Sequence, residues 1–281
     1  LNVLGVTCVA GNVPLNLTSV NALKICELSG FFSVPVFRGS PAPLKRKLIT
    51  AEHVHGKTGL DGTDLSIKKK ELESTDAVDF IIECTEKYRD EKITICALGP
   101  LTNVAKVLKK ESVLTESIEE IVLMGGGFFE GGNITPAAEF NIYVDPEAAK
   151  IVLESGLKIT MLPLDVTHKT LVQRNFLEKL RKSGKNSAIQ AAKLLDFFER
   201  YDVEKYGSQG GPLHDPNVIV YLLNPEIYNE RLVNVEVEVN SELTRGMTVV
   251  DWWNVTDRRP NAYYINEVKE NEFFETVLNN L

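Results

Sequence analysis

The sequence predicts an α/β fold in which helices flank a mostly parallel central sheet, in an open Rossmann-like arrangement. Apolar runs rich in Val and Ile alternate with segments of helical periodicity, which is the pattern of successive β–α units. The 281 residues are 43% hydrophobic and 25% charged, as expected of a globular protein. No linker rich in Gly, Ser or Pro divides the chain, so residues 1–281 are predicted to form a single domain.

The first half of the chain contains the predicted parallel strands and the helices between them. The expected strands are Leu1–Val9, Val34–Phe37, Ile93–Ala97, Glu120–Met124 and Lys158–Leu162. The expected helices are Leu17–Ser29, Asp76–Arg89, Leu101–Lys110 and Asp145–Ser155. Asn16 is predicted to cap the first helix, and Gly30 lies just past its end.

The second half shifts toward helices and ends with a late antiparallel strand pair. Helical periodicity predicts helices at Val172–Lys182, Ser187–Tyr206 and Pro216–Leu223. Alternating apolar and polar residues over Leu232–Asn240 and Met247–Trp253 predict two strands that pair with each other. A final helix is expected over Glu267–Asn279.

Charge and composition exclude several classes of partner. The 31 Lys and Arg residues against 39 Asp and Glu give a formal net charge of −8, which repels nucleic acid and anionic membranes. The longest apolar runs, such as Ile121–Met124, are far shorter than the roughly 20 residues that cross a bilayer. A soluble, cytoplasmic protein that binds a neutral or cationic small ligand, or a metal ion, is expected. The four cysteines lie in apolar stretches and are predicted to be reduced core thiols: Cys8, Cys26, Cys84 and Cys96.

Four connecting segments are too distinctive to be simple linkers. The segment Arg38–Thr75 is much longer than the two to six residues usual for such a loop, and it contains EHVHGKTGLDG. The other three are VAGNVPL after the first strand, the glycine-rich stretch after Met124, and GSQGGPLHDPN before the helix at Pro216. Loops at the carboxyl edge of a parallel sheet build ligand sites, so we expect a site where these three segments meet.

The loop Gly125–Asn141 has the composition of a sugar-binding loop. Five glycines allow close approach of the backbone to a ligand, and Asn133, Glu139 and Asn141 can bond to several hydroxyl groups. No GxGxxG pattern opens a helix here and no GK[ST] follows, so a dinucleotide or phosphate loop is not indicated. The alternative is a glycine-rich surface turn in which Glu139 is solvated.

The motif LHDP places His214 and Asp215 side by side at the start of the helix that begins with Pro216. Asp215 is either a helix cap or a ligand for a hard cation. An imidazole can protonate a leaving group near pH 7, which makes His214 a candidate acid and His55 a second candidate. His53 and His168 are expected to satisfy local backbone groups.

Taken in order, the motifs resemble those of the inosine-uridine preferring nucleoside hydrolases over nearly the whole chain. They are VAGN (Val9–Asn12), EHVHGKTGLDG (Glu52–Gly62), LGPLTN (Leu98–Asn103), LMGGG with AEFNIYVDPEAA (within Leu123–Ala149), PLDVTH (Pro163–His168) and LHDP (Leu213–Pro216). The resemblance implies the nucleoside hydrolase fold and hydrolysis of the N-glycosidic bond of purine or pyrimidine ribonucleosides to ribose and free base. It also implies a calcium-bound water as nucleophile, no organic cofactor, and a homodimer or homotetramer.

The resemblance further implies a role for particular residues. Asp215 matches a calcium carboxylate, and Leu98 stands where a Thr usually offers its backbone carbonyl to the ion. His214 matches the residue near the leaving base, and Tyr206 is the expected base-side contact. The residues expected to hold the ribose or enclose the substrate are Asn12, His55, the Met124 backbone, Asn133, Glu139, Phe140 and Asn141.

One departure from the family pattern is large. The opening DxDxGxDD motif, which supplies the other calcium carboxylates and the water-activating Asp, is absent, and Asp61, Asp64 and Asp165 belong to other motifs. Because the sequence starts in mid-pattern without Met, we expect a preceding segment that carries this motif. The alternatives are a catalytically inactive nucleoside-binding homologue and, from the same substrate class, a nucleoside phosphorylase, although the loops offer no Arg or Lys cluster for phosphate.

Overall fold

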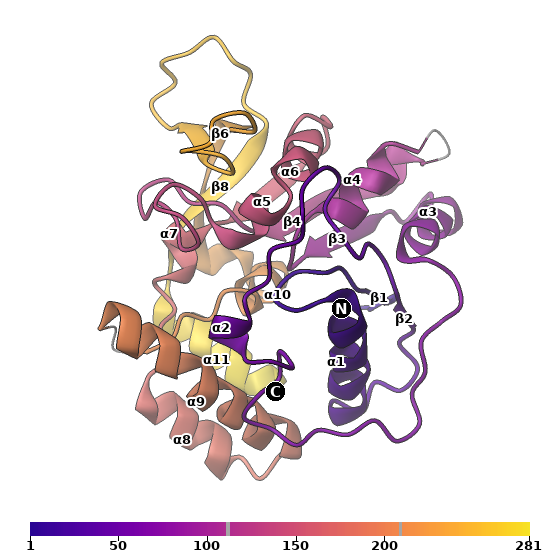
Figure 1. The fold of residues 1–281 in the computed structure, drawn as a ribbon, viewed down its shortest axis with the longest axis vertical. Helices are drawn as coiled ribbons and strands as arrows, with labels where there is room; N and C mark the ends of the chain where they lie inside the picture. Colours follow the sequence, from indigo (N-terminus) through magenta and orange to yellow (C-terminus); the bar gives the residue numbers. More distant parts are fainter. Residues whose placement is uncertain (111–112, 208–209) are drawn as a thin grey trace.

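The predicted α/β fold with a mostly parallel sheet is confirmed. The computed structural model describes residues 1–110, 113–207 and 210–281, without the side chains of residues 199, 201–203, 205 and 206. Within these residues a six-stranded sheet has the order β3-β4-β5-β8-β6-β7 (Figure 1). Its strands are β3 (Ile93–Ala97), β4 (Ile118–Met124), β5 (Ile159–Leu162), β8 (Ala262–Val268), β6 (Tyr228–Val237) and β7 (Thr248–Asp251). A separate parallel pair consists of β1 (Val6–Thr7) and β2 (Val36–Phe37).

The central strands are buried on both faces, which explains their continuous apolar runs. In β4 the side chains of Ile121 and Leu123 pack into one core cluster, and those of Val122 and Met124 pack into another. The strands β3, β4, β5 and β8 run parallel, whereas β6 runs antiparallel to both β8 and β7. The β6–β7 pairing confirms the predicted late antiparallel pair.

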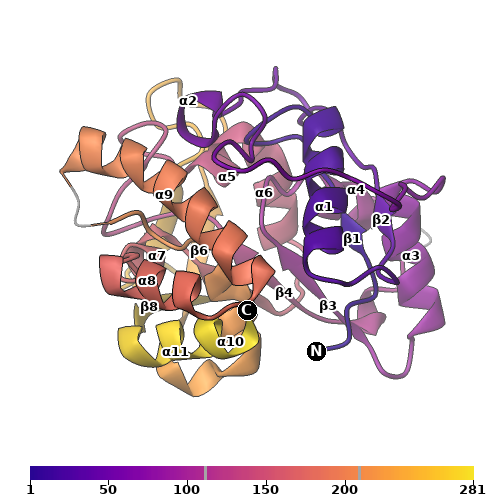
Figure 2. The same ribbon diagram turned by 90° about the horizontal axis from the view of Figure 1, so that it is seen from below.

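Helices cover both faces of the sheet (Figure 2). The helices α4 (Thr102–Leu108) and α6 (Pro146–Leu153) share a core cluster with Ile121 and Leu123, and α3 (Ala77–Lys87) packs against α4. On the opposite face α10 (Pro216–Leu223) packs against Val122 and Met124. Asp76 and Asp145 cap α3 and α6 by accepting hydrogen bonds from backbone N–H groups.

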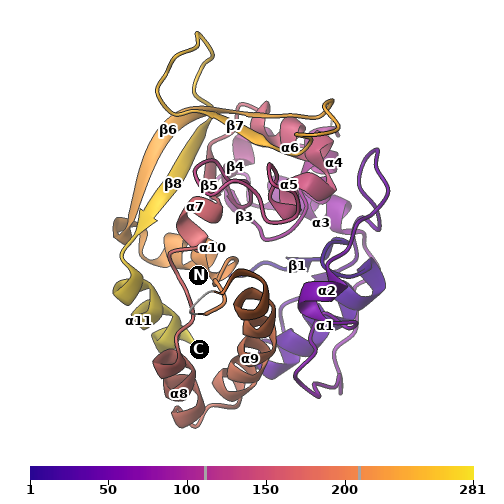
Figure 3. The ribbon, with the colours of Figure 1, turned by 60° about the vertical axis from the view of Figure 1, so that its left-hand side comes forward.

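A second helical layer and several short elements surround the carboxyl edge of the sheet. The helices α8 (Arg174–Lys182), α9 (Asn186–Tyr206) and α11 (Glu270–Asn280) pack around their own apolar cluster. The short helix α2 (Glu52–His55) lies beside α9 and contacts it (Figure 3). The remaining elements are α1 (Leu15–Leu28), α5 (Phe140–Val144), α7 (Leu164–Thr167) and two 3₁₀ turns, η1 (Thr115–Ser117) and η2 (Pro225–Ile227).

The prediction of a buried strand over Leu1–Val9 was wrong in extent. Only Val6 and Thr7 pair, in register with Val36 and Phe37. Leu1 and Val3 are 73% and 51% exposed. The partner β2 is two residues long, so it cannot hold the earlier residues in a ladder.

The predicted starts of two helices and one predicted helix cap also differ from the structure. Residues 262–268 form β8 in the middle of the sheet, so the final helix begins at Glu270 and Glu267 lies in the strand. The first helix begins at Leu15, and Pro14, whose carbonyl accepts hydrogen bonds from Leu17 and Thr18, replaces Asn16 as the cap. Gly30 follows the end of this helix with φ +77°, as predicted.

The four cysteines are not all in the core. Cys8, Cys26 and Cys84 are buried and unpaired as predicted, but Cys96 is exposed. The reason is its place on β3, an edge strand of the six-stranded sheet on which alternate side chains are uncovered. In the part of the chain that the structure describes, none of the helices combines the length and the apolar character that a membrane crossing requires.

Candidate active site

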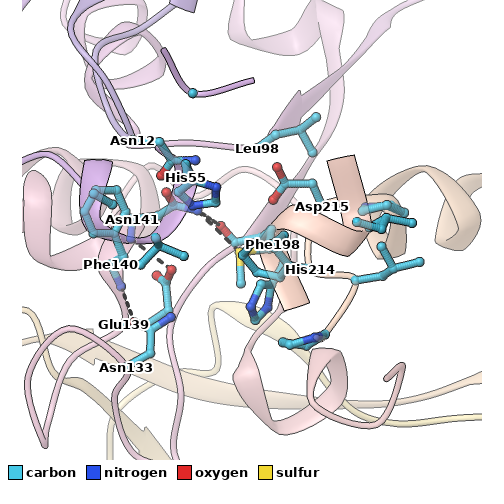
Figure 4. A pocket seen from close by; sticks show the side chains of 18 of the residues that line it. Asn12, His55, Leu98, Asn133, Glu139, Phe140, Asn141, Phe198, His214 and Asp215 are labelled. Atoms are coloured by element: carbon cyan, nitrogen blue, oxygen red, sulfur yellow. Dashed lines mark hydrogen bonds between the residues drawn. The ribbon is translucent and has the colours of Figure 1, made fainter. Parts of the chain in front are cut away.

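A pocket of about 720 Å³ opens at the carboxyl ends of the parallel strands, as the loop analysis predicted. Asn12 follows β1, Leu98 follows β3 directly, and Met124 ends β4. These residues line the pocket together with residues of the glycine-rich loop, α2, α9 and the start of α10 (Figure 4). The volume lies in the range of small-molecule sites.

Glu139 lies at the floor of the pocket and is anchored by three backbone groups. Its carboxylate accepts hydrogen bonds from the N–H groups of Gly126 (3.1 Å), Asn141 (2.9 Å) and Ile142 (3.2 Å). The side chain is 2% exposed, so the alternative of a solvated glutamate is wrong. Burial raises the pKa of Glu139 to about 7, although the three N–H groups act in the opposite direction.

The neighbouring amides are held by backbone contacts that leave polar atoms facing the pocket. Asn133 Oδ1 accepts from the N–H of Phe140 at 2.9 Å, which leaves its amide nitrogen for a ligand. Asn141 Nδ2 donates to the Met124 carbonyl at 3.1 Å, which leaves its amide oxygen as an acceptor. Asn12 also lines the pocket, and its backbone carbonyl accepts a hydrogen bond from the N–H of Ala51 at 2.8 Å. Fixed amides of this kind can discriminate the hydroxyl groups of a sugar.

Asp215 faces the pocket and does not cap a helix. Its side chain makes no capping hydrogen bond to α10, so the helix-cap alternative is wrong. Enclosure by the protein, followed by the nearby charge of Glu139, raises the pKa of Asp215 to about 7. Its carboxylate points into the pocket (Figure 4), and Leu98 lines the same pocket. A cation bound here would relieve the cost of placing two carboxylates close together.

His214 lies beside Asp215 with one ring nitrogen already engaged. Its Nδ1 is 2.8 Å from the hydroxyl of Thr167, and the ring centroid lies 5.7 Å from that of His168. Burial, with smaller contributions from His168 and His55, lowers the pKa of His214 to about 3. The imidazole is therefore neutral near pH 7 in the free protein, and its other nitrogen is available to a ligand.

His55 closes the pocket from α2. Its ring stacks on Phe198 of α9, with centroids 5.4 Å apart and an interplanar angle of 17°. Burial, followed by His53, lowers the pKa of His55 to about 4. Asp61 holds the following loop, because its carboxylate accepts from the N–H groups of Lys57 (3.0 Å) and Thr58 (3.1 Å). Phe140, whose N–H donates to Asn133, is buried and also lines the pocket.

The structure places ten of the eleven site residues expected from the sequence around one cavity. They are Asn12, His55, Leu98, Met124, Asn133, Glu139, Phe140, Asn141, His214 and Asp215. Tyr206 ends α9, but its side chain lies outside the described part of the chain.

The sequence analysis missed several residues of the pocket wall. Phe198 and its neighbour Phe197 line the cavity from the described part of α9, and aromatic residues within a long amphipathic helix give no signal of a pocket. The expectation for His168 was wrong, because its Nδ1 contacts the Glu130 carboxylate at 3.1 Å rather than a backbone group. Glu130 comes from the glycine-rich loop, so the pair depends on a tertiary contact that sequence spacing cannot show.

The described residues contain no group of three or more His, Cys, Asp or Glu side chains arranged to hold a metal ion. Hard cations prefer oxygen ligands, and the pocket offers oxygen atoms at and near Asp215. Ca²⁺ takes six to eight oxygens, so Asp215 and one carbonyl supply only part of such a shell.

Comparisons with known proteins agree with this geometry. The family model described as inosine-uridine preferring nucleoside hydrolase matches residues 1–275. An uncharacterised protein of Schizosaccharomyces pombe is 45% identical over 281 residues, covering 100% of this chain and 91% of that protein. A pyrimidine-specific ribonucleoside hydrolase of a Shewanella species is 43% identical, covering 100% of this chain and 88% of its own length. The structure of a purine-preferring ribonucleoside hydrolase from Gardnerella vaginalis superimposes with a TM-score of 0.91 at 29% identity, over 99% of this chain and 89% of that chain.

Proposed function

This chain belongs to the inosine-uridine preferring nucleoside hydrolase family, and we propose that it hydrolyses the N-glycosidic bond of ribonucleosides to ribose and a free base. The observation that carries the proposal is a pocket whose lining combines two kinds of polar group. Carboxylates and amides can bind a sugar diol, and imidazoles can assist the departure of a base.

Glu139, Asn133 and Asn141 are proposed to bind the ribose. Glu139 offers acceptor lone pairs, Asn133 an amide donor and Asn141 an amide oxygen, each held by the backbone contacts described above. Because the protein fixes these groups before the substrate arrives, little ordering cost remains at binding. The binding energy can then favour the flattened, oxocarbenium-like sugar of the transition state.

Asp215 and the Leu98 carbonyl are the proposed protein donors for calcium. The carboxylate of Asp215 lies close enough to Glu139 for the two charges to oppose each other, which favours a bound cation between substrate and protein. When bound, calcium orients the sugar hydroxyls and lowers the pKa of a coordinated water.

His214 is proposed to assist the departing base. Thr167 engages Nδ1, which directs the other ring nitrogen to the ligand. As the glycosidic bond breaks, negative charge develops on the base. That charge strengthens a hydrogen bond from the neutral ring and favours uptake of a proton by the ring, and the protonated imidazole can then pass a proton to the base. His55, stacked on Phe198, covers the cavity on the α2 side and excludes water from the base.

Two other activities make different demands on the same pocket. Phosphorolysis needs a phosphate site, and the described lining of the cavity contains no Lys or Arg. Nucleoside binding without turnover is the second candidate, because the described residues supply only part of a calcium shell. It shares the pocket with the hydrolase and differs from it only in catalysis.

Base release from uridine and from inosine separates these activities. With calcium present and phosphate absent, the hydrolase produces ribose and free base from at least one of the two nucleosides. Calorimetric titration with the same nucleosides measures binding independently. Binding without base release would favour the inactive homologue, and release that requires phosphate would favour the phosphorylase.

A further inference from the structure

A pair of contacting polar side chains, Glu130 and His168, lines the pocket beside His214 and has no part in the function proposed above. Their side chains are 46% and 34% exposed, and His168 Nδ1 lies 3.1 Å from Glu130 Oε2. Both residues face the cavity. An exposed ion pair contributes little to stability, so its position at the pocket wall suggests a role in binding.

The pair is built on a buried support. Asp165 is 3% exposed, and its carboxylate accepts hydrogen bonds from the N–H groups of Phe128 (2.9 Å) and Glu130 (2.7 Å) and from the hydroxyl of Tyr264. The glycine-rich loop is therefore fixed at Glu130. His168 is fixed on the other side as the C-cap residue that follows α7, where its N–H donates to the Leu164 carbonyl at 3.0 Å.

The pair lies beside His214 in the pocket. The ring of His168 is 5.7 Å from that of His214 and tilted by 52°. Thr167, which precedes His168, contacts Nδ1 of the same His214 at 2.8 Å. The pair is therefore placed next to the residue proposed to assist the leaving base.

We propose that Glu130 and His168 recognise the polar edge of the leaving base. This inference rests on the proposed function and deepens it. A carboxylate only accepts hydrogen bonds, so Nδ1 of His168 carries the proton of their contact. The second ring nitrogen of His168 and the second oxygen of Glu130 then remain for the ligand. A nucleobase edge offers complementary ring N–H, amino and carbonyl groups, whereas a simple aryl leaving group offers none of these.

The test compares leaving groups on one sugar. Steady-state kinetics are measured for uridine, cytidine, inosine and p-nitrophenyl ribofuranoside with the wild type, Glu130→Gln and His168→Asn. We expect each variant to raise KM for the nucleosides by about tenfold, the effect of one lost hydrogen bond. The p-nitrophenyl riboside, which has the same sugar and no base edge, should change less than twofold. The ratio of uridine to cytidine turnover should also shift in Glu130→Gln, since these bases differ in ring N–H and amino groups.

A matched ion pair supplies the control. Lys92 and Glu119 lie 3.1 Å apart with 46% and 55% exposure, and neither lines the pocket. Glu119→Gln should leave all four substrates unchanged. Equal losses on nucleosides and on the p-nitrophenyl riboside, or no losses, would overturn the base-edge role. Failure of the wild type on every substrate would instead overturn the proposed function.

A second measurement does not depend on the variants folding. The chain has four histidines, so imidazole NMR signals of the wild type can be followed during titration with free uracil and hypoxanthine. We expect saturable shifts of a solvent-accessible histidine signal together with a buried one. Shifts confined to buried histidines would contradict contact between the base and His168.

Discussion

Asp215 carries the proposed metal site, because its carboxylate faces the pocket without a capping hydrogen bond. We expect Asp215→Ala to abolish both tight calcium binding and base release, since a hard cation loses much of its charge compensation with one carboxylate. Calorimetry with calcium and a base-release assay measure the two losses. Asp61→Asn is the matched control, because Asp61 lines the same pocket but its carboxylate is engaged by Lys57 and Thr58. Unchanged calcium affinity in Asp215→Ala would remove Asp215 from the site.

His214 is expected to act mainly in the transition state. His214→Ala should lower kcat by about 10²–10⁴-fold on nucleosides and change KM less, as for other general acids. A p-nitrophenyl riboside, whose leaving group needs no proton, should be spared. Comparable losses on both substrates would show that His214 acts through the structure of the pocket.

His55 makes the stability of the protein depend on pH. The folded-state pKa of His55 is about 4, below the ordinary value of 6.5, so His55 binds a proton more tightly in the unfolded chain than in the folded protein. The stability contribution is complete above pH 6.5 and is lost as the pH falls toward 4. When the pH falls from 7 to 5, the free energy of unfolding of His55→Gln should therefore rise by about 1–2 kcal/mol relative to that of the wild type. Urea unfolding at the two pH values measures this difference, and a constant difference would contradict the buried, neutral assignment.

At the site, sequence reasoning found the residues that motifs carry and missed those that depend on tertiary contacts. Glu139, Asn141 and Asp215 lie in short, distinctive motifs, and the carboxyl-edge rule placed them together. Glu130 and His168 are 38 residues apart in the sequence but in contact in the structure. The His55–Phe198 contact joins two separate helices. No local pattern encodes such pairs.

Among the structural elements, the short helix α7 and its C-cap residue position several groups that line the pocket. Asp165 holds the glycine-rich loop, Thr167 contacts His214, and His168 pairs with Glu130. The sequence assigned no helix to these residues. A four-residue helix has no periodicity to detect.

Removal of the Asp165 carboxylate should destabilise the protein. Asp165→Ala leaves two backbone N–H groups and the Tyr264 hydroxyl without their acceptor, and we expect a loss of about 2–4 kcal/mol in the free energy of unfolding. Asp165→Asn, which retains one acceptor oxygen, should lose less. Urea denaturation measures both, and a loss below about 0.5 kcal/mol in Asp165→Ala would contradict the supporting role.

Strands were predicted best where both faces are buried. β5 and the Ile121–Met124 part of β4 are buried throughout within the sheet, and each strand was found within two residues of its observed limits. β8 was missed, because its sequence AYYINEV mixes polar residues with aromatic ones and lies next to a strong helical pattern. Its pairing with β5 and β6, which come from distant parts of the chain, stabilises it as a strand.

At the scale of the whole molecule, the sheet order explains how distant residues form one site. Asn12, Leu98 and Met124 follow or end the parallel strands β1, β3 and β4, whose carboxyl ends lie at the pocket, and Asp215 reaches the same pocket from the start of α10. The helices α2 and α9 lie side by side (Figure 3), and residues of both line the pocket. The central claim is that this assembly cleaves a glycosidic bond with water.

The direct test follows the oxygen that reaches the sugar. Uridine and inosine are incubated with the protein and calcium in ¹⁸O-labelled water, with and without inorganic phosphate, and the products are analysed by mass spectrometry. The hydrolase should yield free base and ribose that carries one ¹⁸O, at a rate that does not depend on phosphate. A ribose phosphate as product, or no base release from either nucleoside while binding is retained, would contradict hydrolysis.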